Sequence, residues 1–325
     1  MKPTFPLLRL PDNVIIKVLE NLRLRQLFFI SLLSTNVKNH VTSLGLRVDC
    51  VNIFISRMIR LVVFIGRTYF HFIIYNDSND QNAGALPADI TLPVAPGYLR
   101  NQDPIIQLTT PLFNFSKWLN HIRTVFCYNK PPNLIFDQGC ERFELRSLKA
   151  SIRNVDLLVV FIQSPDIQYK NILKFFNAPN KMYLQTNPFE DTCQIQQIFI
   201  QNFQSLAFHD VYSLDDMLLI NSEKVEFSRP ISQKQFNQFL KHWIRGSNPR
   251  LQRISLKINL TDFARGEVYL KGIKCMEMSE EAKNEICHNH RLSNVNMVQI
   301  RRNDGTTAVI ATKNLDGRLS MFIIP

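Results

Sequence analysis

Residues 10–44 read LPDNVIIKVLENLRLRQLFFISLLSTNVKNHVTSL, and this stretch decides how the chain is organised. Its apolar residues recur at helical spacing from the first residue onward. Pro11 suits the first turn of a helix, and Asp12 places a carboxylate at the positive end of the helix dipole. Ser34 or Thr35 can cap a further short helix. The stretch therefore predicts three short helices.

The middle of this stretch carries more apolar surface than three helices can cover. The segment from Leu24 to Leu33 is apolar on nearly all sides, and three short helices enclose only a small core. The surplus predicts a partner. The alternative is a helical cap that covers a larger domain of the same chain.

The pattern also resembles a known module. The residues that carry the resemblance are Leu10, Pro11, Val14, Ile15, Val18, Leu19, Leu22, Leu27, Ile30, Ser31 and Leu32. In this order they resemble the F-box, by which substrate receptors attach to the Skp adaptor of SCF-type ubiquitin ligases. The resemblance implies that all of these residues except Ser31 bind the adaptor. Arg25 departs from the family, since many members have an acidic residue there, and the third helix lacks the tryptophan often found in it.

Length and composition are those of an ordered globular protein. The chain has 325 residues, 45% of them hydrophobic and 20% charged, which is enough for two domains. The net charge is +11, and the first 75 residues hold ten lysines and arginines against three acidic residues. A basic N-terminal module suits an acidic protein partner or, as the alternative function, nucleic acid. The sequence shows no zinc finger, RNA-binding strand motif or lysine-arginine block to favour nucleic acid.

The cysteines and the apolar runs bear on location. The six cysteines are scattered without a C-x-x-C pair, and the start of the chain shows no apolar signal-peptide core. We therefore expect free thiols and a cytoplasmic or nuclear location. Residues 51–75 are strongly apolar but are interrupted by Arg57, Arg60 and Arg67, so no membrane-spanning helix is expected.

A strand-rich connector follows the helices. Residues 47–55 and 60–75 are rich in Val, Ile, Phe and Tyr and predict two or three strands. Five prolines between residues 83 and 111 predict an irregular segment. We accordingly expect domains at residues 1–46, 47–113 and 114–325.

From residue 114 onward, helical patterns alternate with short runs of the form L-x-x-L-x-L. Ser213 and Ser232 can cap two of the helices. The apolar runs, each expected to form a strand, begin at Leu145, Met182, Phe203, Ser222 and Leu251. Units about 20–33 residues apart predict parallel strands with crossover helices, stacked as an irregular leucine-rich-repeat-like solenoid. An ordinary α/β sheet is the alternative.

The pattern changes after Gly266. We expect a strand at residues 267–273, a helix at 279–287, and a β-meander whose strands span residues 297–301, 307–312 and 319–324. Asp304-Gly305 and Asp316-Gly317 mark its turns. The fold class is therefore α+β: three N-terminal helices, the solenoid and a C-terminal β-meander.

The region from about residue 115 resembles the F-box-associated domain of type 2. The motifs that carry this resemblance lie at residues 118–122, 187–190, 214–218, 239–243 and 304–305. The resemblance implies that this region recognises a target protein, without indicating which one.

Signatures of catalysis are missing from the sequence. It has no G-x-S-x-G, Walker loop or G-x-G-x-x-G. Cys287, His288 and His290 form the most metal-like cluster, but the second ligand pair that tetrahedral zinc requires is missing. Adjacent Asp215 and Asp216 would point about 100° apart on a helix. We expect no enzymatic activity, cofactor or metal. The interpretation is a substrate receptor that binds a Skp adaptor, through it a cullin scaffold, and an unknown target protein.

Overall fold

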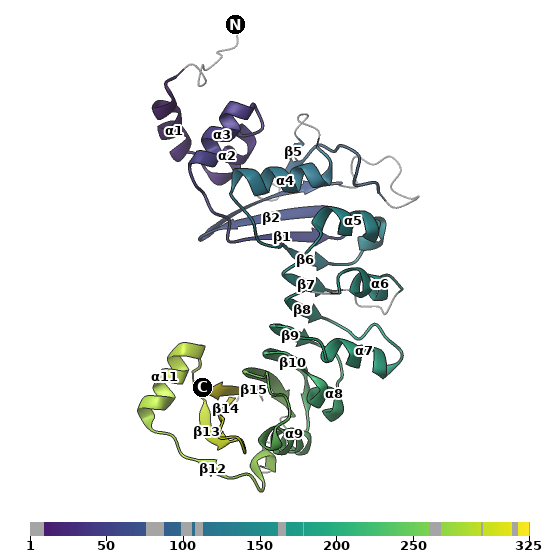
Figure 1. Ribbon diagram of the computed structural model, residues 1–325, viewed down its shortest axis with the longest axis vertical. Coiled ribbons are helices and arrows are strands. Elements are labelled where there is room, and N and C mark those ends of the chain that lie inside the picture. Colours follow the sequence, from purple (N-terminus) through teal and green to yellow (C-terminus); the bar gives the residue numbers. More distant parts are fainter. Residues whose placement is uncertain are drawn as a thin grey trace. The chain divides into compact units, whose positions relative to one another are not determined.

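The computed structural model describes residues 10–75, 88–98, 106–107, 113–161, 167–177, 179–259, 268–293, 295–313 and 318–324 (Figure 1). Its contacts divide the chain into two compact units. The first unit comprises Met1–Phe161 and Asn171–Pro179, and the second comprises Ile162–Lys170 and Asn180–Pro325. The domain boundaries expected at residues 46 and 113 stay predictions.

The first unit begins with the three expected helices. They are α1 (Asp12–Glu20), α2 (Leu24–Ile30) and α3 (Thr35–Ser43). Pro11 immediately precedes α1, and the Ser34 hydroxyl accepts a hydrogen bond from the Val37 amide to cap α3 (3.3 Å). Each helix buries two apolar side chains, at i and i+4 in α1 and α3 and at adjacent positions in α2.

A mixed sheet follows the helices in the first unit. Its strand order is β7-β6-β1-β2-β3-β4-β5, parallel between β1, β6 and β7 and antiparallel elsewhere. The strands are β1 (Cys50–Ile55), β2 (Ile59–Ile65), β3 (Thr68–Ile74), β4 (Gly97–Tyr98), β5 (Ile106–Gln107), β6 (Asn133–Phe136) and β7 (Leu157–Val160). Between β5 and β6 the chain forms helix α4 (Phe115–Val125). Between β6 and β7 it forms the 3-10 helix η3 (Cys140–Arg142) and helix α5 (Leu145–Ile152). The sheet thus contains both the predicted connector strands and the first strands beyond residue 114.

An aromatic core joins α2 to this sheet. Phe28 is fully buried, and its ring lies 5.1 Å from the rings of both Phe70 and Phe72 on β3. Trp118 of α4 lies 6.2 Å from the Phe28 ring and donates its indole N–H to the Val94 carbonyl (3.2 Å). Offset and tilted rings at such distances add to the energy of burial. Trp118 is fully buried and therefore belongs to this core.

In the second unit, parallel strands alternate with helices. The parallel strands are β8 (Lys181–Leu184), β9 (Ser205–Phe208), β10 (Lys224–Ile231) and β11 (Arg253–Ile258), and the helices between them are α7 (Thr192–Phe199), α8 (Leu214–Leu219) and α9 (Gln233–Arg245). Helix α6 (Ile167–Phe175) is divided between the two units. The Ser213 hydroxyl caps α8 and the Ser232 hydroxyl caps α9, as predicted.

The meander predicted at the C-terminus is confirmed. Strand β15 (Arg318–Ile324) pairs antiparallel with β11, and β14 (Thr307–Lys313), β13 (Asn296–Arg301) and β12 (Cys275–Met276) follow in order. The predicted helix begins after its Ser279 cap and is α11 (Glu280–His290). Gly305 adopts a φ of +95° in the predicted turn. The Asp316-Gly317 turn lies outside the described residues.

Two predicted strands are wrong. The run that begins at Leu145 forms α5, because Leu145, Leu148 and Ile152 fall at i, i+3 and i+7 and all three are buried. Residues Val268–Leu270 form the 3-10 helix η4 rather than part of a strand. An L-x-x-L run satisfies both the helical and the strand template, so packing decides between them. The coarser expectation, N-terminal helices followed by a large sheet with helices, holds.

A buried asparagine holds the end of α8. Asn248 is 5% exposed and adopts a left-handed φ of +52°. Its side-chain amide donates hydrogen bonds to the carbonyls of Met217 and Ile220, both at 2.9 Å. The last carbonyls of a helix have no partner within the helix, and Asn248 supplies one from the segment between α9 and β11.

Candidate functional site

The structure separates the ten predicted adaptor-binding residues into two groups. Ile15, Leu19 and Leu27 are buried, with exposures of 3%, 0% and 3%, and form the interior of the helical module. The other seven are partly or fully exposed: Leu10, Pro11, Val14, Val18, Leu22, Ile30 and Leu32. Periodicity identifies an apolar face, but the core and a docking surface can share it. Adaptor contact stays a prediction for all ten.

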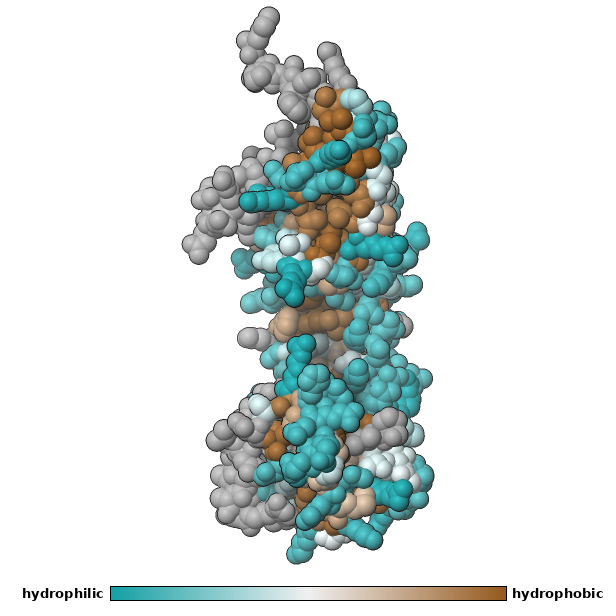
Figure 2. Space-filling model, turned by 90° about the vertical axis from the view of Figure 1, so that its left-hand side faces the viewer, coloured by the Kyte–Doolittle hydropathy of each residue, from teal (hydrophilic) through white to brown (hydrophobic). Residues whose placement is uncertain are grey.

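One exposed residue was missed. Leu33 is 73% exposed, the highest value among the large apolar side chains of residues 10–46. It lies just beyond α2 and immediately before the Ser34 cap. Leu32 and Leu33 are adjacent at the end of α2, and adjacent side chains there point in different directions. This pair of leucines in the sequence therefore indicates that one of them faces solvent. Figure 2 shows apolar side chains gathered at the height where Figure 1 places α1–α3 and the first strands.

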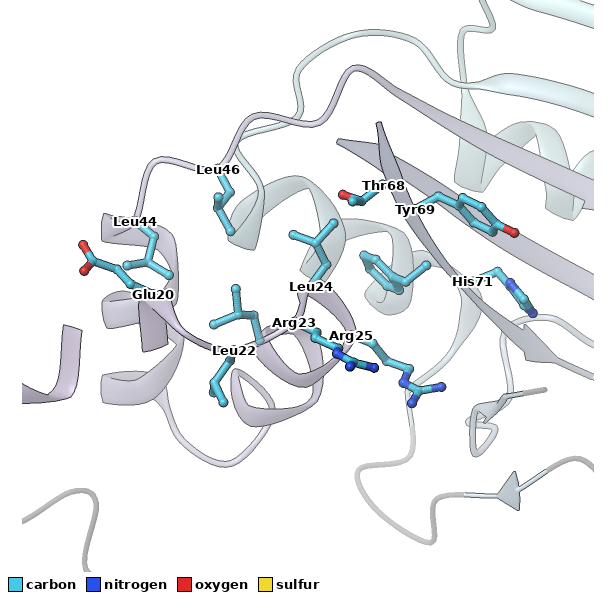
Figure 3. Close-up of a pocket in the computed structure, with 12 residues that line it drawn as sticks. Glu20, Leu22, Arg23, Leu24, Arg25, Leu44, Leu46, Thr68, Tyr69 and His71 are labelled. Atoms are coloured by element: carbon cyan, nitrogen blue, oxygen red, sulfur yellow. The ribbon is translucent and has the colours of Figure 1, made fainter. Parts of the chain in front are cut away.

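A cavity of about 940 Å³ opens between these helices and β3 (Figure 3). Its apolar lining consists of Leu22, Leu24, Leu27, Leu44, Leu46 and Phe70. Its polar lining is Glu20, Arg23, Arg25, Thr68, Tyr69 and His71. Mainly apolar cavities of this size with a few convergent polar groups are typical of binding sites. The sequence analysis did not find this one, because its lining comes from three separate segments.

The polar side of the cavity is electropositive. In Figure 3, Arg25 lies between Arg23 and His71. Burial lowers the pKa of His71, and the nearby cations Arg60 and Arg25 lower it further. A positive potential around a neutral imidazole favours an anionic group at this place.

A buried hydrogen bond ties the helical module to α4. The Ser31 hydroxyl donates to the Phe28 carbonyl (2.6 Å), so it accepts from Nε2–H of His121 (2.7 Å). His121 is 9% exposed. Its burial, together with the charge of Lys38, lowers the pKa of its imidazole to about 4.

We expect the stability of the first unit to fall as the pH is lowered from about 6.5 to 4. In this window the unfolded chain binds a proton on His121 and the folded chain does not. The contribution is complete above pH 6.5 and amounts to about 3 kcal/mol. Urea unfolding of wild type and His121→Gln between pH 4 and 7.5 measures it, with exposed His288→Gln as the control. Equal pH slopes for wild type and His121→Gln would contradict this assignment.

The two tryptophans of the predicted recognition motifs are structural. Trp118 and Trp243 are both fully buried. Asp216 accepts from the Ser213 amide, and its own amide donates to the Ser213 hydroxyl, so it belongs to a capping box. Trp118 therefore stabilises the first unit, and Trp243 and Asp216 stabilise the second.

Among the described residues there is no candidate metal-binding group and no candidate membrane-spanning helix. No group of three histidine, cysteine or acidic side chains there is placed to hold a metal ion. Cys287 and His290 belong to α11, and the His290 ring stacks on Phe322 with centroids 4.1 Å apart. No described helix is long and apolar enough to cross a membrane.

Comparisons with known proteins agree with this organisation. Residues 7–49 match the F-box domain family, and residues 194–256 match the family described as F-box associated, type 2. The chain carries an F-box and an F-box-associated domain. The F-box match spans all three helices, and the second match runs from α7 to β11. Neither family description names a catalytic activity.

A curated relative is named for an F-box associated domain. The chain is 26% identical over 258 residues to the F-box associated domain-containing protein sdz-33 of Caenorhabditis elegans. The aligned region covers 79% of each of the two chains. No solved structure matches the chain. The resemblance inferred from the sequence is confirmed.

Proposed function

We propose that this protein is the substrate-recognition subunit of an SCF-type ubiquitin ligase. The F-box helices would bind a Skp adaptor and, through it, a cullin scaffold. The F-box-associated domain would bind a target protein, with its strand–helix units acting as an irregular leucine-rich-repeat-like scaffold. The protein would work in the cytoplasm or nucleus, in ubiquitin-dependent degradation.

The mechanism is proximity. A receptor that holds its target beside the ligase raises the effective concentration of acceptor lysines, and it makes or breaks no bond itself. This fits a chain whose matched families are described by no catalytic activity.

The observation that carries the proposal is the excess of exposed apolar side chains on the F-box. Ile15, Leu19 and Leu27 already fill the interior of the module. Val14 and Leu33 nevertheless remain 36% and 73% exposed. Apolar side chains that are exposed, and are not packed in the interior of a module, commonly form a protein interface.

We expect Val14→Asp to abolish capture of the chain by a Skp adaptor in co-purification. The substitution puts a charge into an interface that excludes water, and Val14 is exposed in the free protein. Asn13→Asp is the matched control, because it adds the same charge to the neighbouring exposed position of α1. Capture of wild type and Asn13→Asp without Val14→Asp supports the receptor. Capture of none of the three, or of all three equally, contradicts it.

Nucleic-acid binding is the alternative function, favoured by the basic N-terminal quarter of the chain. Salt separates the two, since binding to phosphates weakens steeply as the salt concentration rises. A nucleic-acid affinity that falls by orders of magnitude between 50 and 200 mM salt, without adaptor capture, would favour the alternative.

A further inference from the structure

Among the described residues, no strand pairs with the first half of the β3 edge that borders the cavity. Strands β2 and β3 form a hairpin whose two-residue turn, Gly66-Arg67, places Ile65 opposite Thr68. In such a hairpin the flanking pair is hydrogen-bonded and the pairs then alternate. The backbone groups of Tyr69 and His71 therefore point away from β2.

The neighbouring pairing supports this direction. Tyr69, His71 and Ile73 are alternate residues of β3, so their backbone groups point to the same edge. On that edge Ile73 pairs with Gly97 of β4. Among the described residues, no strand lies opposite Tyr69 or His71 on the same edge. An edge that already accepts one strand can accept another further along.

The cavity lies beside this open edge. Figure 3 places Leu22, Leu24, Leu44 and Leu46 on the helical side of the cavity and Thr68, Tyr69 and His71 on the strand side. A strand added to β3 would point alternate side chains to opposite faces. One set would enter the leucine-lined space beside Phe70. The other set would lie on the face of Tyr69 and His71, toward Arg25.

The charged residues of the cavity indicate which side chains of an added strand would face Tyr69 and His71. Arg23 and Arg25 are on the rim, and Glu20 is the one acidic side chain among the described residues that line the cavity. Arg25 and Arg60 both lower the pKa of His71, which agrees with a positive potential beside Arg25. Acidic side chains complement it, and basic ones would be repelled.

We propose that an extended segment of the target protein, alternating apolar and acidic residues, binds here as an added strand on β3. Main-chain hydrogen bonds to Tyr69 and His71 supply affinity, and the leucine cavity and the two arginines supply specificity. The inference rests on the proposed function, since it names the kind of segment that the receptor holds. The site lies between the F-box and the sheet of the first unit, so it would add to the target contacts proposed for the F-box-associated domain.

The test uses the full chain and a fluorescein-labelled eight-residue peptide that alternates leucine and glutamate. Its counterpart alternates leucine and lysine. Fluorescence anisotropy should give at least about tenfold tighter binding of the acidic peptide, and the difference should shrink as salt rises. Equal affinities for the two peptides, or no binding of the acidic one, would overturn the proposal.

Strand addition is tested with N-methylated peptides. In an extended chain the amides of successive residues point to opposite edges, so methylating the leucine amides or the glutamate amides blocks opposite edges. One methylated peptide should lose at least about tenfold in affinity and the other should bind nearly as before. Equal binding of both means that the peptide is not an added strand.

Variants of the protein locate the site. His71→Pro removes the outward N–H at an edge position where proline is tolerated, and His71→Ala keeps that N–H as the matched control. We expect His71→Pro and Arg23→Glu each to weaken acidic-peptide binding about tenfold or more, and His71→Ala to change it less than threefold. Unchanged binding by both His71→Pro and Arg23→Glu would overturn the proposal.

Two further measurements separate this inference from its alternatives. If wild type forms a dimer in sedimentation velocity and His71→Pro does not, a second copy of the chain occupies the edge and the proposal is overturned. Adaptor capture is measured on the same variants. Peptide selectivity without adaptor capture contradicts the proposed function alone, and adaptor capture without peptide selectivity contradicts this inference alone.

Discussion

Replacing Asn248 by aspartate is expected to lower the free energy of unfolding of the second unit by about 3–5 kcal/mol. The asparagine amide donates to the Met217 and Ile220 carbonyls from a site that is 5% exposed. Aspartate has the same shape, but at neutral pH it brings a negative charge against these carbonyl oxygens. A buried charge without a partner is among the costliest single changes in a protein.

The measurement is hydrogen exchange followed by mass spectrometry, which reports each unit separately. Amides of β9, β10 and β11 should lose protection in Asn248→Asp, while those of β1–β3 keep theirs. Lowering the pH should restore part of the loss, because protonation neutralises the aspartate. Asn221→Asp is the control, since Asn221 bonds an exposed partner, Asn202, and should change stability by less than about 1 kcal/mol. Equal effects of the two substitutions would refute the role assigned to Asn248.

The second large effect concerns two adjacent residues of α1. Ile15→Asp is expected to unfold the F-box, because Ile15 is 3% exposed and a carboxylate there loses its hydration without gaining a partner. The expected cost is about 4 kcal/mol or more, which exceeds what a small helical module can bear. Val14→Asp should cost less than about 1 kcal/mol, since Val14 is 36% exposed.

Both variants should fail to bind a Skp adaptor, for different reasons. Hydrogen exchange of α1–α3 tells these reasons apart: protection is lost in Ile15→Asp and retained in Val14→Asp. Retained protection in Ile15→Asp would show that its side chain is not part of the interior. Adaptor-binding tests therefore need surface variants, because loss of capture by a core variant reports folding alone.

Local signals were sufficient for much of the fold. Pro11 before α1, the Ser34 cap of α3, the Ser213 and Ser232 caps and the glycine turn at Gly305 each act within a few residues. Such signals depend on backbone geometry and on hydrogen bonds near in sequence. The helices and the C-terminal meander could be predicted for this reason.

Where two templates fit the same residues, local signals failed. The run at Leu145 satisfies a strand motif and a helical stripe equally, and the structure forms α5 with Leu145, Leu148 and Ile152 buried. The segment Val268–Leu270 has apolar residues of strand type but forms a 3-10 helix. Tertiary packing overrides weak intrinsic preference in such short segments.

The sequence by itself determined that an F-box precedes an F-box-associated domain, because both are marked by apolar spacing and local motifs within each segment. Only the tertiary structure decided which F-box residues are interior and which are surface, since Ile15 and Val14 look alike until the neighbouring helices and β3 are placed. The cavity beside Tyr69 and His71 is likewise visible only in the tertiary structure. That cavity needs the α1–α2 turn, the segment after α3 and the edge of β3 to meet, and strand pairing between distant residues sets this meeting rather than any local preference.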